Sequence, residues 1–120
     1  MKSTFFAIPG LLVILLVLTA GQPRQVLTTS LRVTVLDNLG NPVQGAAVAL
    51  YNNETDYERS ENPAAGPALS DDKGRVTFKD LRPAAYFMEV SKEDMSNYGG
   101  GNKTAVLEKN KLNRVNVIID

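Results

Sequence analysis

The stretch LRVTVLDNLGNPVQGAAVALY, residues 31–51, decides the fold that the sequence predicts. Apolar side chains stand at every second position on both sides of a polar interruption: Leu31, Val33, Val35, Val48 and Leu50. This period of two is typical of strands with one face toward a core. The interruption, DNLGNP at 37–42, combines side-chain acceptors, a glycine free to take positive φ and a proline of fixed φ. The sequence therefore predicts two strands, at about 30–37 and 45–51, with a turn between them.

The rest of the chain repeats this pattern. Further strands are expected at residues 68–70, 75–79, 86–90, 104–108 and 115–119. Tyr86 is expected to point inward and Phe87 to be the less buried aromatic, because neighbours in a strand face opposite ways. Asp71-Asp72-Lys73-Gly74 predicts a hairpin turn. Short strands separated by turns, with no long amphipathic helix, predict an all-β fold, a β-sandwich of six to seven strands.

Two long links interrupt the predicted strands, at residues 52–67 and 92–102. In the first, Thr55-Asp56-Tyr57-Glu58 fits a capping box and predicts a single helical turn over 55–61. Asn62-Pro63 is expected to end that turn, because the residue before proline avoids the α region. The second link contains three consecutive glycines, which contribute no packing to a core.

These links supply the candidate contact residues: Tyr57, Tyr98 and Asn102. An exposed tyrosine beside asparagine and glycine presents a flat amphipathic surface that can stack on a sugar or contact a protein. The alternative is a tyrosine that lies on the surface without a ligand, and for Tyr57 one that the helical turn lays against the sandwich. Both interpretations stay open at this stage.

Composition excludes several classes of function. The chain of 120 residues has 13 basic and 13 acidic residues, so it lacks the basic surface of a nucleic-acid-binding protein. It has no Cys and no His, which removes thiol catalysis, disulfides, serine triads that use histidine and the usual zinc ligands. The sequence therefore predicts a protein that is not an enzyme and binds no cofactor. An enzyme would need two carboxylates facing each other in a cleft.

The clustered acidic residues are expected to form turns and not a metal site. Asp37, Asn38 and Asn41, and the pair Asp71-Asp72, lack the spacing and the distal glutamate of a calcium loop. Aspartate and asparagine side chains commonly accept hydrogen bonds from backbone N–H groups two residues further on. No catalytic and no metal-binding residue is predicted.

Residues 1–21 predict a secretory signal peptide. Lys2 precedes an apolar run that ends in Thr19-Ala20-Gly21, small residues that suit a signal peptidase. An uncleaved N-terminal anchor is the alternative, and only then would the protein contact a membrane. Residues 22–29 are expected to be a flexible leader and residues 30–120 the folded domain. Export without cysteine suits a bacterial periplasm, cell surface or exterior.

The succession of residues 31–51 and 70–90 resembles the carboxypeptidase regulatory-like domain. The matching residues are Asp37, Gly40-Asn41-Pro42-Val43, Gly45-Ala46, Val48, Asp72-Lys73-Gly74, Phe78, Leu81, Pro83 and Tyr86. The likeness covers residues 31–90, and residues 115–119 match the closing strand less specifically. It implies a transthyretin-like (prealbumin-like) sandwich, also classed among carbohydrate-binding-like folds, in a small exported protein of the Bacteroidetes type. It transfers no catalytic residue, because fold does not fix activity.

Two functions follow as hypotheses. The first is an exported, non-catalytic module with a structural or protein-interaction role in the cell envelope. The second is a glycan-binding module that uses the loop aromatics. The expected partner is a cell-envelope protein or a glycan of unknown identity, and not a nucleic acid.

Overall fold

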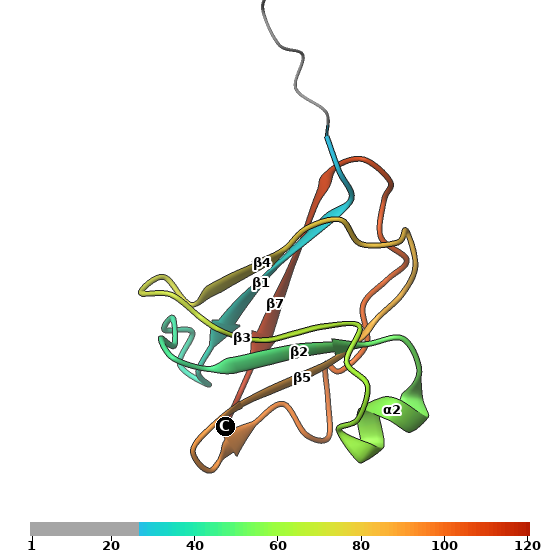
Figure 1. Ribbon diagram of the computed structural model, residues 1–120. Coiled ribbons are helices and arrows are strands. Elements are labelled where there is room, and N and C mark those ends of the chain that lie inside the picture. The colour runs from blue at the N-terminus through green and yellow to red at the C-terminus, as the bar shows by residue number, and fades with distance from the viewer. Residues whose placement is uncertain (1–26) are drawn as a thin grey trace, which may run out of the picture.

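Seven strands and one short helix form the part of the chain that the computed structural model describes, residues 27–120. The predicted signal peptide and residues 22–26 of the predicted leader lie outside the described residues. The elements are β1 (Ser30–Leu36), β2 (Ala47–Tyr51), α2 (Glu54–Arg59), β3 (Ala65–Leu69), β4 (Arg75–Phe78), β5 (Phe87–Lys92), β6 (Met95–Ser96) and β7 (Leu112–Ile118). In Figure 1 the strands form two layers, and α2 lies at one end of them.

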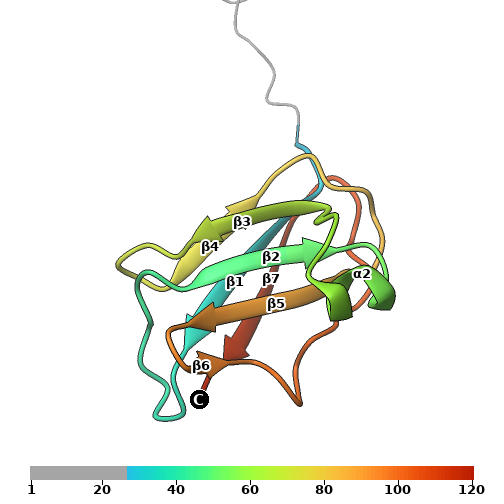
Figure 2. The same ribbon diagram turned by 60° about the horizontal axis from the view of Figure 1, so that its bottom comes forward.

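The strands form a two-sheet sandwich. One sheet has three strands in the order β4-β1-β7, and the other has four in the order β3-β2-β5-β6. β1 is antiparallel to β4 and parallel to β7, whereas all pairs in the second sheet are antiparallel. Figure 2 shows β3, β2 and β5 crossing in front of β1 and β7. The predicted β-sandwich of six to seven strands is confirmed at this level.

The predicted alternation decides which side chains fill the space between the sheets. Leu31, Val33 and Val35 of β1 are at most 1% exposed. They belong to one hydrophobic cluster with Val48 and Leu50 of β2 and with side chains of β4, β5 and β7. The inward orientation of Val76, Phe78 and Tyr86 is confirmed, because all three are buried, and Phe87 is only half-buried.

The helical turn predicted at 55–61 exists, but its cap was assigned to the wrong residue. α2 begins after Asn53, whose Oδ1 accepts the Asp56 N–H at 2.9 Å and whose Nδ2 donates to Asp56 Oδ2 at 3.0 Å. Asn53 has extended backbone, which an N-cap requires, so Thr55 lies inside the helix. The helix ends at Ser60, which takes a left-handed conformation, before Asn62-Pro63.

The strand predicted at residues 104–108 is wrong. The N–H groups of Thr104 and Leu107 donate to the carbonyls of Tyr86 and Ala84, a spacing that does not make a regular ladder. At the end of the segment, Asn113 Nδ2 donates to the Glu108 carbonyl and Asn113 Oδ1 accepts the Glu108 N–H at 2.8 Å. A side-chain amide thus takes the place that a neighbouring strand would fill. Val106 is 69% exposed. The short strand β6, conversely, lies inside the link that was predicted at 92–102.

The predicted turn at residues 71–74 is present, but it does not join a hairpin. β3 and β4 on either side of it belong to different sheets, so this turn crosses the sandwich. Asp71 Oδ1 accepts the N–H groups of Lys73 and Arg75, both at 2.9 Å. Asp37 does the same between β1 and β2, which also lie in different sheets, by accepting the N–H groups of Leu39 and Asn41. Both acidic clusters therefore hold turns, as predicted.

The two crossing turns pack against each other at one end of the sandwich. The Val35 N–H donates to the Gly74 carbonyl at 2.7 Å, and the Val43 N–H donates to the Val35 carbonyl at 2.9 Å. Gly74 has a φ of +75°, and a Cβ on it would lie 2.6 Å from the Val35 carbonyl oxygen. Only glycine fits this contact. Gly40 has a similar φ of +85° but no atom within 4 Å of a Cβ.

No helix within residues 27–120 has the length and apolarity that a membrane span requires.

Replacing Gly74 by alanine will test how much this packing stabilises the sandwich. Gly40→Ala is the matched control, because it imposes the same unfavourable φ in open space and should cost about 1–2 kcal/mol of unfolding free energy. Gly74→Ala should cost about 1–3 kcal/mol more, since the added methyl group must displace backbone. Urea denaturation of both variants measures the difference. Equal costs would contradict the packing argument.

Asp71 should make the sandwich sensitive to acid. The N–H of Arg75, and also that of Lys73, donates to its carboxylate and holds the pKa of Asp71 below the usual 3.8. A lowered pKa in the folded state contributes stability above pH 3.8 that is lost as the pH falls through the lowered value. The stability difference between the wild type and Asp71→Asn should therefore shrink between about pH 5 and pH 2. Urea denaturation across this range measures it, and a constant difference would argue against the prediction.

Candidate functional site

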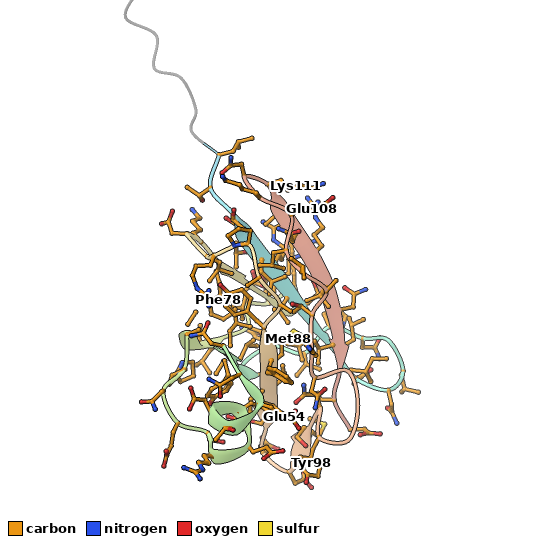
Figure 3. All side chains as sticks on the ribbon, turned by 90° about the vertical axis from the view of Figure 1, so that its right-hand side faces the viewer. Glu54, Phe78, Met88, Tyr98, Glu108 and Lys111 are labelled. Atoms are coloured by element: carbon orange, nitrogen blue, oxygen red, sulfur yellow. The ribbon has the colours of Figure 1, made fainter. Side chains whose placement is uncertain are left out.

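The three predicted contact residues lie around one shallow hollow, where α2 meets the loop of residues 97–102. Its volume is about 320 Å³. The residues that line it are Glu54, Tyr57, Glu58, Tyr98, Gly99, Gly100 and Asn102. In Figure 3, Glu54 and Tyr98 lie at the same end of the molecule, far from Lys111 and Glu108. We call this hollow the tyrosine hollow. It joins residues from both long links, which lie about 40 positions apart in the sequence.

Tyr57 forms the fixed wall of the tyrosine hollow. Its ring stacks on Phe87 of β5, with ring centroids 5.8 Å apart and an interplanar angle of 29°. It also meets Tyr51 of β2 edge to face at 6.1 Å. Lys103 Nζ lies 5.3 Å from the centroid of the Phe87 ring. The predicted alternative, that the helical turn lays Tyr57 against the sandwich, is therefore what the structure shows for this side chain.

Glu89 holds α2 to the sheet beneath the hollow. Its Oε1 accepts from the Tyr51 hydroxyl at 3.1 Å and its Oε2 from the Ser60 hydroxyl at 2.6 Å. Burial raises the pKa of Tyr51 from its ordinary 10.0, and the hydrogen bond to Glu89 and the charge of Glu89 raise it further. The phenol consequently stays protonated and continues to donate at neutral pH.

The loop that bears Tyr98 is fixed at both ends to β5. At one end the buried Asn97 accepts the Val90 N–H through Oδ1 at 3.1 Å and donates from Nδ2 to the Met88 carbonyl at 2.9 Å. At the other end the Asn102 carbonyl accepts the Met88 N–H at 2.7 Å. Thr104 then bonds Tyr86 through its own N–H and its hydroxyl. Residues 102–104 thus pair with β5 through a short antiparallel bridge between Phe87 and Lys103, and the side chains of Asn97 and Thr104 add further hydrogen bonds to its edge.

Tyr98 projects freely between these anchors. Its side chain is 88% exposed, and the glycines that follow have no atoms near them. Its N–H donates to the Ser96 hydroxyl at 3.3 Å, which orients its backbone. The hollow can thus offer one free aromatic face beside the half-exposed Asn102 side chain and two glutamates. This is suited to stacking and hydrogen bonding on a flat or polar partner.

Within residues 27–120, no group of three or more acidic side chains is placed to hold a metal ion. Glu54 and Glu58, at the edge of the hollow, lie four residues apart on α2.

The residues that anchor the loop and α2 at the hollow were not predicted from the sequence. Asn97, Thr104 and Glu89 hold the loop and the helix in place. Glu89 and Thr104 stand in predicted strands, where alternation indicates the face of a side chain but not its partner, and Asn97 stands in a predicted link. Only the position of Asn97, directly before the exposed Tyr98 and the glycines, marks the point where the loop leaves the sheet. Whether an asparagine is buried depends on its neighbours in space.

Comparison with known proteins identifies the fold and no sequence family. No family model and no curated protein matches the sequence. Among solved structures, the chain is similar to the major pilin subunit BcpA of Bacillus cereus, with 17% identity and a TM-score of 0.51 over 78% of this chain and 30% of that one. It is also similar to the pilus 2b backbone protein of group B streptococcus, with 17% identity and a TM-score of 0.53 over 77% and 40%.

These similarities show a mostly-β sandwich of the kind found in pilus subunits. The chain spans less than half the length of either structure, and at 17% identity the likeness concerns the fold alone. No sequence family is identified, so membership of the carboxypeptidase regulatory-like group stays a prediction.

Asn97→Ala should loosen the loop and destabilise the protein. It leaves a buried N–H and a buried carbonyl of β5 without their partner, which should cost about 2–4 kcal/mol of unfolding free energy. Tyr98→Ala is the control from the same loop and should change the stability by less than about 0.5 kcal/mol, because that side chain is exposed. Urea denaturation compares them. If both variants are equally stable, the anchoring role of Asn97 is wrong.

Proposed function

We propose that the protein is an exported, non-catalytic module with a structural or protein-interaction role at the cell surface or elsewhere in a bacterial envelope. The observation that supports it is the sandwich itself, which is similar to one part of pilin and pilus backbone subunits. The absence of histidine and cysteine from the sequence removes the groups most often used in hydrolytic sites. The strands and crossing turns form the scaffold, and the exposed Tyr98 lies in the loop at one end of it.

The proposal includes a division of the chain. Residues 1–21 act as a secretory signal, residues 22–29 as a leader, and residues 30–120 as the folded domain. The composition of the first segment supports the export step. The hydrophobic cluster supports the last boundary, because its members lie between Leu31 and Ile119.

Assignment to the carboxypeptidase regulatory-like group is part of this proposal. The residues that suggested it include Pro42 and Gly74, which face each other across the two crossing turns. That contact supports the view that the two turn motifs belong together as one structural signature. It says nothing about a ligand.

Export and lack of catalysis can be tested together on protein expressed with its own N-terminus in a bacterial host. Mass spectrometry of the protein from the envelope and medium should find an N-terminus near residues 20–22. The purified product should show no turnover above buffer in a panel of ester, peptide and glycoside substrates. Full-length protein retained in the cytoplasm would contradict export, and a saturable activity would contradict the non-catalytic role.

A second candidate function is glycan binding at the tyrosine hollow. The observation that favours it is that Tyr57, Tyr98 and Asn102 line the same hollow. A sugar ring could stack on the exposed face of Tyr98 while its hydroxyl groups bond Asn102 and the adjacent glutamates. Tyr57 would serve as the rigid wall, because Phe87 and Tyr51 hold it.

Glycan binding can be tested with an array and matched variants of Tyr98. Any glycan that binds the wild type should bind Tyr98→Ala at least about tenfold more weakly, a loss of about 1.4 kcal/mol, whereas Tyr98→Phe keeps the ring and most of the affinity. Calorimetry on the best glycan gives both values. An array without signal, or equal binding by Tyr98→Ala, would reject this function while leaving the structural role intact.

A further inference from the structure

The four edges of the two sheets differ in how far they are protected from pairing with another strand. β3 contains Pro67, which has no N–H to donate. β6 has two residues, and Ser96 exchanges backbone hydrogen bonds with Asp120. β4 has four residues, and at Arg75 the turn aspartate Asp71 uses the free side. The fourth edge, β7, has seven residues and no proline, so it is the most open edge within residues 27–120.

The hydrogen bonds to β1 show which groups of β7 point outward. The Ser30 N–H donates to the Lys111 carbonyl at 3.0 Å, and the Ile119 N–H donates to the Leu36 carbonyl at 2.9 Å. Because backbone groups alternate sides along a strand, the odd-numbered residues of β7 bond β1 and the even-numbered residues face away. The outward groups belong to Leu112, Arg114, Asn116 and Ile118. They have no hydrogen-bond partner among the described residues.

Two hollows border this strand. A hollow of about 450 Å³ borders the second half of β7, between residues 116–118 and the glycine loop. A second hollow, of about 410 Å³, borders the first half, between residues 111–115 and residues 104–108. The strand that the sequence predicted at 104–108 does not form there. The sheet that contains β7 has three strands, whereas the sheet opposite it has four.

We propose that β7 pairs antiparallel with β7 of a second copy of this chain, about a two-fold axis at Val115. The two three-stranded sheets then form one continuous sheet of six strands. This register pairs Arg114 with Asn116 of the second copy and Leu112 with Ile118 of the second copy. All four outward residues of each strand are used, because they lie symmetrically about Val115.

Side-chain chemistry selects this register over its neighbours. An axis at Arg114 would place two arginines directly opposite each other, which is unfavourable. An axis at Asn116 would pair Leu112 with Asp120, whose backbone groups already bond Ser96. The axis at Val115 brings two apolar side chains together on the outer face, Leu112 and the 58% exposed Ile118. It also places Val115, which is partly buried, opposite Val115 of the second copy.

The residues along the edge favour a second copy as the occupant. The sequence carries 13 basic and 13 acidic residues, so two copies approach without net repulsion. The edge is self-complementary, as a two-fold contact requires, since its one arginine faces a neutral asparagine.

Solution mass and a proline variant test the pairing. Residues 22–120, which contain the whole described sandwich, should be dimeric by sedimentation at about 10–500 µM, as is usual for a modest interface. Asn116→Pro removes an outward N–H without breaking a bond to β1, and it should raise the dissociation constant at least about tenfold. Asn116→Thr keeps the N–H and should stay dimeric. A monomeric wild type, or a dimer unaffected by the folded Asn116→Pro variant, would overturn the proposal.

Cysteine cross-linking tests the register, since the natural chain has no cysteine. In the proposed register, Val115 faces its own copy as a non-hydrogen-bonded pair about 4.5 Å apart at Cα, within disulfide range. Val115→Cys should therefore form a covalent dimer on mild oxidation. The two Val117 residues would lie about 14 Å apart along the strands, so Val117→Cys should cross-link at least about tenfold more slowly. Equal rates for the two variants would rule out this register.

Discussion

Burial of the inward side chains of β1 is the constraint on which the structure depends. β1 is the central strand of its sheet, and Leu31, Val33 and Val35 are at most 1% exposed. Burying each such side chain contributes on the order of 1.5–3 kcal/mol. Because β4 and β7 both pair with β1, their own inward residues reach the core only while β1 keeps its register. A shift by one residue would turn the whole set outward.

The two crossing turns connect the sheet that contains β1 to the second sheet of the sandwich. Each turn from one sheet to the other uses an aspartate that accepts two backbone N–H groups, Asp37 after β1 and Asp71 before β4. Their packing through Gly74 closes one end of the molecule. The tyrosine hollow lies at the end where α2 and the glycine loop leave the second sheet, and there the chain carries exposed aromatic surface. The turns therefore stabilise the fold, and the links are left available for contact.

The site illustrates how polar side chains can substitute for strand pairing. Asn97 and Thr104 bond the edge of β5 between its pairing with β6 and the single bridge from Phe87 to Lys103, and the Asn113 side chain bonds the backbone of Glu108. Asn97 and Thr104 anchor the two ends of the loop, and Tyr98 between them stays exposed. Tyr57, on the other side of the hollow, is packed against Tyr51 and Phe87. Among the described residues, β7 pairs with β1 alone and forms an edge of its sheet.

The sequence by itself determined the positions and inward faces of most strands, the turns at residues 37–42 and 71–74, and the two links. Each of these follows from local properties, the period of two and the turn chemistry of Asp, Asn, Gly and Pro. Only the tertiary structure decided that both turns cross between sheets, that residues 104–108 form no strand, and that Tyr57 and Tyr98 line the same hollow. A period of two specifies which side of a strand is apolar but not which strand lies beside it. Neighbours are chosen by packing between distant segments, and there asparagine side chains compete with backbone for the same hydrogen bonds.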